Sequence, residues 1–407
     1  MTGAPDRERS RSVGFGRGLV VATVLMAGCS LTAGDDGPTS RSQGADVASV
    51  TVAQVKPGPR EDLPSALDDP DADGLPDPVV DTDEIISGGP PPDGIPPIDE
   101  PRFLPADAVD FLDDREPVLA LEIDGDARAY PIQVMIWHEI VNDTVGEVPV
   151  SVTYCPLCNT AVAVDRRVGE RVLSFGTSGS LYRSALVMYD RQTESLWSHF
   201  NSLAIAGALT GTELENFPVA TIGWGDWREA HPDGLVLSRD TGVDRDYGSN
   251  PYPGYDDVDS PPFLFEGEVD DRLAAKTRVV GLGLDTTPTA IRLDPLVEKG
   301  VLAFELDDAP VVAWALPGTS SALDDADVAG GRDVGATGVF TPAHDGRALT
   351  FTRSGREFVD DQTGTRWNVL GTATAGPLEG TSLEPLEHVD TFWFAWAAFA
   401  PETVVLP

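Results

Sequence analysis

Cysteine and positive charge are both scarce in this sequence. Only three cysteines occur in 407 residues, which is too few for a scaffold held together by several disulfides. Lysine and arginine number 28 against 67 aspartate and glutamate residues, so the net charge is −39. Because nucleic-acid phosphates are bound by lysine and arginine, we expect no nucleic-acid partner. The same deficit argues against electrostatic docking on anionic lipid.

Long apolar runs are also rare, and the clearest one lies near the N-terminus. Four arginines precede an apolar run from Leu19 to Ala27, which is too short to span a bilayer. A basic start followed by a short apolar run predicts a secretory signal. Small residues before Cys29 resemble a lipobox, so we predict a signal over residues 1–29, with a lipid on Cys29 as the membrane anchor. An ordinary signal peptide is the alternative. In either case the protein is expected to act outside the cytoplasm, at the cell surface or in the periplasm.

The segment that follows is polar, acidic and rich in proline. Residues 30–83 show neither helical nor strand periodicity, which predicts a disordered acidic linker between the membrane and the folded part. Within this linker, carboxylates recur at alternate positions around a glycine turn, a spacing that suits Ca²⁺. The possible calcium ligands are Asp69, Asp71, Asp73 and Asp77. An ordinary solvated spacer is the alternative, because an acidic chain contains such runs by chance.

The rest of the chain contains two similar halves. The matching residues are Asp190-Arg-Gln-Thr-Glu-Ser-Leu-Trp197 with Asp360-Asp-Gln-Thr-Gly-Thr-Arg-Trp367, and Trp224 and Trp227 with Trp393 and Trp396. Such self-similarity predicts two tandem copies of one ancestral domain. We place the first unit at residues 84–265 and the second, degenerate unit at residues 266–407.

The two units differ where chemistry is expected. The replaced pairs are Cys155 by Leu316, Cys158 by Thr319, and His231 by Ala400. A core is needed in both copies, whereas a functional site is needed only once. The comparison therefore indicates that the first unit carries the site. His344 and His388 lie in the second unit and support no site by this reasoning.

Short β-branched runs separated by glycine and proline turns predict the fold class. Val148–Tyr154 and Ala161–Asp165 read as strands on either side of the cysteine turn. Pro131–Asp143 reads as a short helix that begins at its proline. We therefore expect a mainly β (α+β) fold: two tandem degenerate copies of a β-rich domain with short helices, preceded by a disordered acidic tether.

Several long motifs resemble a single family. They include Ile86-Ser-Gly-Gly-Pro-Pro-Pro-Asp-Gly-Ile-Pro96, Trp137-His-Glu-Ile-Val-Asn-Asp143, Tyr154-Cys-Pro-Leu-Cys158 and Met188-Tyr-Asp-Arg-Gln-Thr-Glu-Ser-Leu-Trp197. The sequence is similar to the domain-of-unknown-function family 3179, whose members are common among secreted bacterial and archaeal proteins. The resemblance is strong over residues 84–265 and implies little about activity. Two departures stand out: Asn159 where the family usually has glycine, and His199 where it usually has glutamine. The second departure indicates that His199 is incidental rather than a ligand.

The Cys155-Pro-Leu-Cys158 motif brings two sulfurs within reach of one metal ion or of each other. As thiolates they could bind copper or zinc together with an imidazole. As a dithiol they could serve a thiol–disulfide oxidoreductase, with Cys155 as nucleophile and Cys158 as resolving thiol. As a static disulfide they could stiffen a non-enzymatic module that binds a ligand or a protein.

The metal site is the leading hypothesis. Its predicted ligands are Cys155, Cys158, His138 and His231, and its predicted supporting residues are Glu139, Asn142 and Asp143. An acidic or amide side chain beside an imidazole can fix the orientation of that ring, although the same contact also stabilises a purely structural histidine. We therefore expect an extracytoplasmic lipoprotein that binds copper or zinc in its first unit. The sequence identifies neither a protein partner nor a small substrate.

Overall fold

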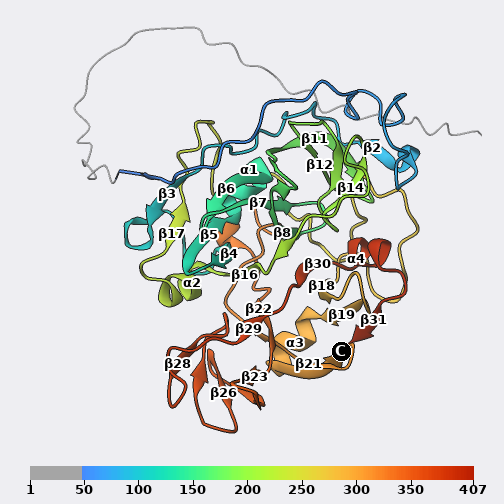
Figure 1. Cartoon of the computed structure of the whole chain (residues 1–407). Coiled ribbons are helices and arrows are strands. Elements are labelled where there is room, and N and C mark those ends of the chain that lie inside the picture. The colour runs from blue at the N-terminus through green and yellow to red at the C-terminus, as the bar shows by residue number, and fades with distance from the viewer. Residues whose placement is uncertain (1–47) are drawn as a thin grey trace, which may run out of the picture. The chain divides into compact units, whose positions relative to one another are not determined.

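The computed structural model describes residues 48–407, which form a mainly β fold (Figure 1). The predicted signal, Cys29 and the first part of the predicted linker lie outside the described residues. The elements before the first repeated block are β1 (Val50–Thr51), η1 (Thr82–Glu84), β2 (Ile85–Ser87), β3 (Arg102–Pro105) and η2 (Ala106–Ala108).

Two blocks of elements follow. The first comprises β4 (Pro117–Ile123), β5 (Asp126–Pro131), α1 (Ile132–His138), β6 (Ile140–Val145), β7 (Val148–Cys155), β8 (Thr160–Asp165), β9 (Arg167–Val168), β10 (Arg171–Val172), β11 (Phe175–Tyr182), β12 (Ala185–Asp190), β13 (Leu196–Ser198), β14 (Leu203–Ala206), β15 (Asn216–Phe217), β16 (Ala220–Gly223), α2 (Trp224–Ala230) and β17 (Leu235–Leu237).

The second block begins after a connector, residues 238–277. It comprises β18 (Arg278–Leu282), β19 (Thr289–Arg292), α3 (Leu293–Lys299), β20 (Val301–Leu306), β21 (Ala309–Leu316), η3 (Val328–Gly330), β22 (Ala336–Thr341), β23 (Ala343–His344), β24 (Arg347–Ala348), β25 (Phe351–Ser354), β26 (Glu357–Asp360), β27 (Arg366–Trp367), β28 (Ala373–Ala375), β29 (Glu384–Pro385), β30 (Val389–Phe392), α4 (Trp393–Phe399) and β31 (Val404–Leu406).

The two blocks share one topology. In the first, the strand orders are β17-β5-β4-β16, β15-β8-β7-β6 and β14-β13-β12-β11. In the second, the corresponding orders are β31-β19-β18-β30, β29-β22-β21-β20 and β28-β27-β26-β25. Even the parallel pairing recurs, between β17 and β5 and between β19 and β31. The two blocks therefore resemble each other in the strand order of these three sheets, as well as in scattered sequence motifs.

The repeated Asp…Trp motif forms the same hydrogen-bonded turn in both blocks. Asp190 accepts from the backbone N–H of Thr193 at 2.6 Å and from the indole N–H of Trp197 at 3.0 Å. Asp360 accepts the equivalent bonds from Thr363 at 2.6 Å and Trp367 at 3.1 Å. Each buried carboxylate thus joins the end of one strand to the core tryptophan of the next.

The blocks are not separate domains divided near residue 265. Contacts unite residues 47–407 into one compact unit, and the largest hydrophobic cluster contains residues of both blocks, such as Trp197 and Trp396. The strand β30 packs beside β8, where Thr391 donates a hydrogen bond to the carbonyl of Cys158 at 3.0 Å. Residues on either side of position 265 therefore share one hydrophobic core.

The second part of the predicted linker, residues 48–83, is ordered against the fold, which corrects that prediction. The strand β1 pairs with β3, and Gln54 donates to Asp143 at 2.8 Å. Ala66 is fully buried in a cluster with Tyr182. Sequence periodicity missed this segment because distant partners, rather than its own repeating pattern, hold it in place.

The predicted calcium ligands are not gathered around a common point. Asp69 accepts from the backbone N–H of Asp71 at 3.0 Å, and Asp71 accepts from Thr82 at 2.8 Å, so both carboxylates serve local turns. Within residues 48–407, no cluster suited to a metal ion includes Asp73 or Asp77.

The four α-helices of residues 48–407 are short, and each has seven residues. The helix predicted from Pro131 ends at His138, because Glu139 adopts a left-handed conformation with φ of 61°. Asn142 and Asp143 therefore lie on β6, which pairs with β7, and not on the helix. In the described part of the chain, no helix has the length and apolarity needed to cross a bilayer.

We predict that Asp360→Ala lowers the free energy of unfolding by about 3 kcal/mol, because it leaves buried donors without an acceptor. Hydrogen bonds from Thr363 and Trp367 hold the pKa of Asp360 below its usual value despite burial, which alone would raise it. The stabilisation is therefore complete above the unfolded-state pKa and declines as pH falls through the lower folded-state pKa. Urea unfolding at neutral and acidic pH measures both effects.

Asp361→Ala is the matched control, because this exposed neighbour makes only a surface hydrogen bond, from Thr350 at 2.7 Å. We expect Asp361→Ala to lower the free energy of unfolding by less than about 1 kcal/mol. Equal urea midpoints for the two variants would show that the Asp360 turn does not stabilise the fold.

Candidate metal centre

The cysteine motif forms the turn between β7 and β8. Cys155 ends β7 and pairs with Thr160, the first residue of β8, so the four intervening residues reverse the chain. Asn159 has φ of 55°, a conformation that glycine adopts freely and asparagine tolerates better than most other residues. This explains why asparagine can stand where the family usually has glycine. The turn places Cys155 and Cys158 close together in the interior.

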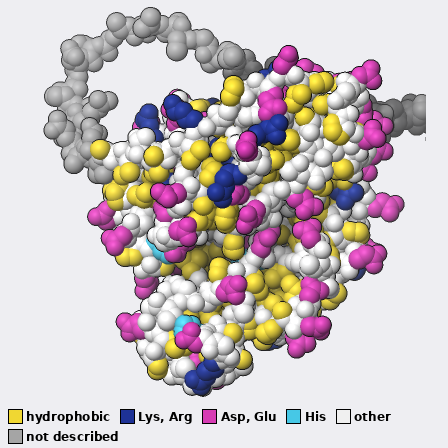
Figure 2. Space-filling view, in the orientation of Figure 1, with side chains coloured by type: hydrophobic (Ala, Val, Ile, Leu, Met, Phe, Trp, Pro, Cys, Tyr) yellow, Lys and Arg dark blue, Asp and Glu magenta, His cyan; other side chains and the backbone are white. Residues whose placement is uncertain are grey.

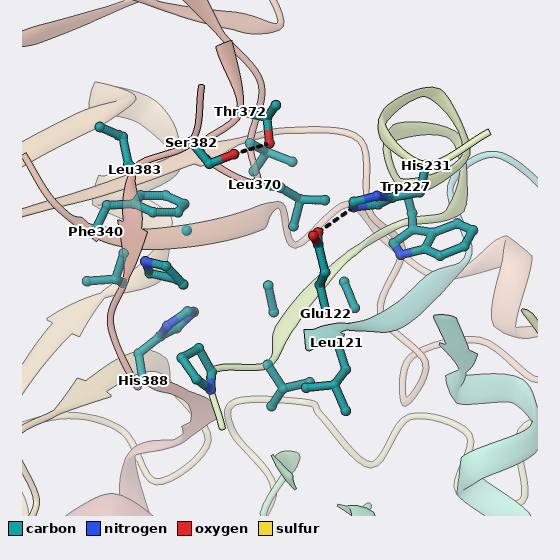
Figure 3. A pocket seen from close by; sticks show the side chains of 18 of the residues that line it. Leu121, Glu122, Trp227, His231, Phe340, Leu370, Thr372, Ser382, Leu383 and His388 are labelled. Carbon is teal, nitrogen blue, oxygen red and sulfur yellow. Dashed lines mark hydrogen bonds and ion pairs between the residues drawn. The ribbon is translucent and has the colours of Figure 1, made fainter. Parts of the chain in front are cut away.

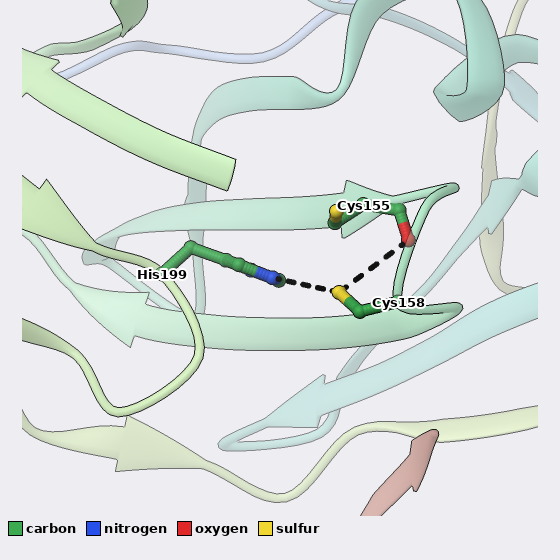
Figure 4. Close-up of side chains that lie close together, drawn as sticks. All are labelled: Cys155, Cys158 and His199. Atoms are coloured by element: carbon green, nitrogen blue, oxygen red, sulfur yellow. Dashed lines mark hydrogen bonds between the residues drawn. The ribbon is translucent and has the colours of Figure 1, made fainter. Parts of the chain in front are cut away.

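His199 completes a cluster with these two cysteines (Figure 4). One ligand atom from each of the three residues lies within 4.8 Å of the others. The distance from the Cys158 sulfur to His199 Nε2 is 3.6 Å. All three side chains are buried, and both cysteines are free thiols. Two sulfurs and one imidazole nitrogen are a donor set for a soft or borderline transition metal.

Thr153 orients the imidazole of His199. The Thr153 hydroxyl donates to the carbonyl of Val162 at 3.1 Å and lies 3.2 Å from His199 Nδ1. Since its proton is used in the first bond, its oxygen accepts from Nδ1–H. Nε2 therefore faces Cys158 and is the nitrogen available to a metal ion. Such a hydrogen bond on the far ring nitrogen is the usual way in which a ligand histidine is held.

The two thiols have opposite pKa shifts. Burial raises the pKa of Cys155, but hydrogen bonds from Cys158 and His199 outweigh it and bring the pKa well below the usual thiol value. Burial, together with the neighbouring Cys155, raises the pKa of Cys158 well above that value. The pair therefore ionises in two separate steps, with Cys155 as the first thiolate. A metal ion binding here would replace the protons shared among the sulfurs and Nε2.

Glu139 brings a carboxyl group to the side of this cluster. It caps α1 in the left-handed conformation, whereas the equivalent helix α3 ends at Gly300, with φ of 88°. Burial, and after it the nearby Cys155, raises the pKa of Glu139 well above its usual value. A buried acid in a strained backbone conformation is typical of functional sites.

Tyrosines of the connector cover the cluster. Tyr255 donates to the carbonyl of Leu157, inside the cysteine turn, at 2.9 Å. Burial raises the pKa of Tyr252, and the nearby Glu139 and Cys155 raise it further. The cluster is consequently enclosed by the connector as well as by the first block.

The second block also fixes the cysteine turn. The carbonyl of Cys158 accepts from the backbone N–H of Phe392 and from the hydroxyl of Thr391, each at 3.0 Å. Thr160 adds a hydrogen bond to Thr391 at 2.7 Å. The position of the Cys158 sulfur therefore depends on β30, an element of the other block.

The two histidines predicted as ligands lie elsewhere. His138 is buried at the end of α1, where Nδ1 lies 2.6 Å from the carbonyl of Pro96 and Nε2 lies 2.5 Å from the hydroxyl of Tyr247. His231 follows α2, and its Nε2 is 3.9 Å from Glu122. Burial lowers the pKa of both rings. Within residues 48–407, neither histidine belongs to the cysteine cluster.

The residues predicted to support an imidazole stabilise strands instead. Asn142 donates to Asp99 and to the carbonyl of Phe175, both at 2.8 Å. Asp143 accepts two hydrogen bonds from Arg128, at 2.9 and 2.8 Å. Of the three predicted supporting residues, only Glu139 lies near a cysteine of the cluster.

The sequence indicates that His199 is incidental, whereas the structure places its imidazole beside Cys155 and Cys158. One signal could have revealed it. Aligning the repeats on Trp197 and Trp367 places Val369 opposite His199. His199 is thus lost in the second unit just as Cys155 and Cys158 are.

Comparison with known proteins assigns a family but no activity. The family described as a protein of unknown function, DUF3179, matches residues 92–403. No curated protein matches the chain, and no solved structure does either. Because the match covers most of the sequence and both repeated blocks, the chain belongs to the DUF3179 family.

Proposed function

We propose that this protein is an extracytoplasmic lipoprotein, anchored through Cys29, that binds a transition metal ion through Cys155, Cys158 and His199. The observation that carries the proposal is the meeting of two thiols and one oriented imidazole nitrogen in a buried turn. Structural ligands of copper and zinc combine in this way. Since the family usually has glutamine in place of His199, we propose this donor set for this chain rather than for every member.

The number of ligands favours Cu(I). Thiolates are soft ligands that select Cu(I), which is stable with three donors, whereas a structural zinc ion takes four protein ligands. Glu139 is not part of the cluster, so among residues 48–407 a zinc ion at this site would lack a fourth protein ligand.

We further infer that the two blocks arose by duplication and that only the first kept the metal site. Their common topology supports this, as does the conservation of the Asp…Trp turn in both. The metal donors of the first block are replaced in the second by Leu316, Thr319 and Val369. In this proposal the second block acts as scaffold, because β30 holds the cysteine turn.

A thiol–disulfide oxidoreductase is the second candidate, and the separated thiol pKa values favour it. A depressed pKa on the first cysteine of a Cys-x-x-Cys motif is typical of such enzymes. Exchange with a protein substrate, however, requires the attacking sulfur to reach another disulfide. Cys155 is 2% exposed and Cys158 is 0% exposed, which argues against that chemistry.

We predict that the purified full chain contains about one copper or zinc ion, and that Cys155→Ser, Cys158→Ser and His199→Gln each lose it. Elemental analysis by mass spectrometry measures the metal content of each variant. His231→Gln is the matched control, because it makes the same substitution at a histidine outside the cluster, and it should retain the metal.

Glu139→Gln tests whether this buried neighbour contributes to the site. It should leave the metal content unchanged, because Glu139 lies outside the cluster. A metal-free chain with two titratable thiols would contradict the metal proposal. Retention of metal in His199→Gln but loss in His231→Gln would contradict the assigned ligand.

We predict that the metal-free protein shows two thiolate ionisations, one below and one above the usual thiol range. His199→Ala should raise the lower pKa, because that substitution removes the imidazole whose proximity lowers the pKa of Cys155. Ultraviolet absorbance of thiolate as a function of pH measures both steps. A single ionisation near the ordinary thiol pKa, unchanged in His199→Ala, would show that the three groups do not interact.

A further inference from the structure

A pocket separate from the cysteine cluster lies between the two blocks. Its volume is about 290 Å³, and it is bounded by β4, β16 and α2 on one side and by β22 and β29 on the other (Figure 3). Its apolar walls include Leu121, Val219, Phe340, Leu370 and Leu383. A pocket of this size, with apolar walls and a few polar groups, is suited to a small organic ligand.

One of these polar groups is His388. Its side chain is directed into the pocket, and the residue is 6% exposed (Figure 3). Nδ1 lies 2.9 Å from the carbonyl of Leu386, to which it donates, so Nε2 of the neutral ring is an acceptor. Among residues 48–407, no group hydrogen-bonds to this Nε2. A buried acceptor without a partner is costly, and a ligand N–H or O–H in the pocket would satisfy it.

The indole N–H of Trp227 is the complementary donor. Trp227 is fully buried, and its nitrogen lies on the side of the ring that faces the pocket (Figure 3). No acceptor for this N–H occurs in the part of the chain that the structure describes. The equivalent Trp396 donates to Thr403 at 2.8 Å. At the matching position of the first block stands Gly234, where a Cβ would lie 2.5 Å from the Trp227 ring, so no side chain can supply the acceptor.

Both histidines of the pocket occur at positions where the blocks differ. His388 immediately precedes β30, and Val219 immediately precedes β16, at the equivalent point of the first block. His231 follows α2, whereas Ala400 follows α4. Each block therefore contributes one histidine to the pocket, and the residue at the equivalent position of the other block is apolar. Packing alone does not explain this divergence, because the surrounding strands are the same in both blocks.

The charges around the pocket disfavour an anionic ligand. Glu122 and Asp124 line it, and neither lysine nor arginine does so among the described residues. Acidic side chains also dominate the face of the molecule seen in Figure 2. A carboxylate or phosphate would therefore meet repulsion without a compensating cation.

We propose that this pocket binds a small neutral molecule with an aromatic or similarly apolar body, one hydrogen-bond donor and one acceptor. The donor meets Nε2 of His388, and the acceptor meets the indole N–H of Trp227. Hydroxyaryl ketones have this combination of groups. The proposal is independent of the metal site, because the pocket and the cysteine cluster share no residue.

4-Hydroxyacetophenone is the probe, and isothermal titration calorimetry on the full chain is the measurement. We expect saturable binding of one molecule per chain. His388→Leu should weaken it about tenfold, through loss of one buried hydrogen bond. Acetophenone lacks the hydroxyl and should bind the unaltered chain about tenfold more weakly, a difference that should disappear in His388→Leu.

His344→Leu is the matched control, because it makes the same substitution on the β23–β24 hairpin, outside the pocket, and it should bind as the unaltered chain does. Leu370→Trp keeps both polar groups but fills the pocket, so binding should be lost. If either variant fails to fold, the comparison of the two probes on the unaltered chain still decides. Absence of saturable binding, or equal affinity for both probes, overturns the proposal.

Discussion

The carbonyl of Cys158 is the point at which the two blocks depend on each other. A buried carbonyl needs a hydrogen-bond donor, and this one receives two from β30 of the second block, at 3.0 Å each, besides a longer contact from Thr160 at 3.3 Å. The same residue carries the sulfur that faces His199. Because the turn is held from the second block, the spacing of the two sulfurs does not follow from the first block alone. The second block, which has neither cysteine nor histidine at the equivalent positions, thus contacts the turn directly.

Burial away from water strongly affects the pKa values of the groups in and beside the cluster. Removing two thiols and an imidazole from water penalises their charged forms, yet hydrogen bonding makes Cys155 the readily ionised member of the pair. Burial, and after it Cys155, instead raises the pKa of the nearby Glu139. A cation entering this environment would exchange with protons rather than with bulk water.

Sequence reasoning predicted the features that depend on local pattern. The β-rich class, the turn between two strands at the cysteines and the repeated Asp…Trp motif all arise from short stretches of chain. The presence of His199 beside the cysteines could not be predicted in this way. His199 directly follows β13 and contacts Thr153 and Cys158 of another sheet and its turn, and such a contact has no signature in sequence spacing. His138 was an attractive ligand because it lies in a dense polar motif, but Pro96 and Tyr247 occupy both its nitrogens.

The same limitation applies to residues 48–83 and to the pocket. Residues 48–83 are held by single side chains that contact distant strands, as Gln54 contacts Asp143. Such contacts need no periodic sequence pattern. His388 had no apparent role in a unit that lacks the cysteines, yet it faces the same pocket as His231. Both cases involve contacts between segments far apart in the chain. Within-chain comparison of the repeats was the most informative sequence signal, and its full use would also have revealed His199.

X-ray absorption spectroscopy at the copper and zinc edges of the purified full chain tests the central claim most directly. The account predicts a bound ion with two sulfur neighbours at about 2.2–2.3 Å and one imidazole nitrogen at about 2.0 Å. The imidazole contribution should disappear in His199→Gln. A spectrum dominated by oxygen neighbours, or one unchanged by that substitution, would contradict the assignment of the Cys155, Cys158 and His199 cluster as a metal centre.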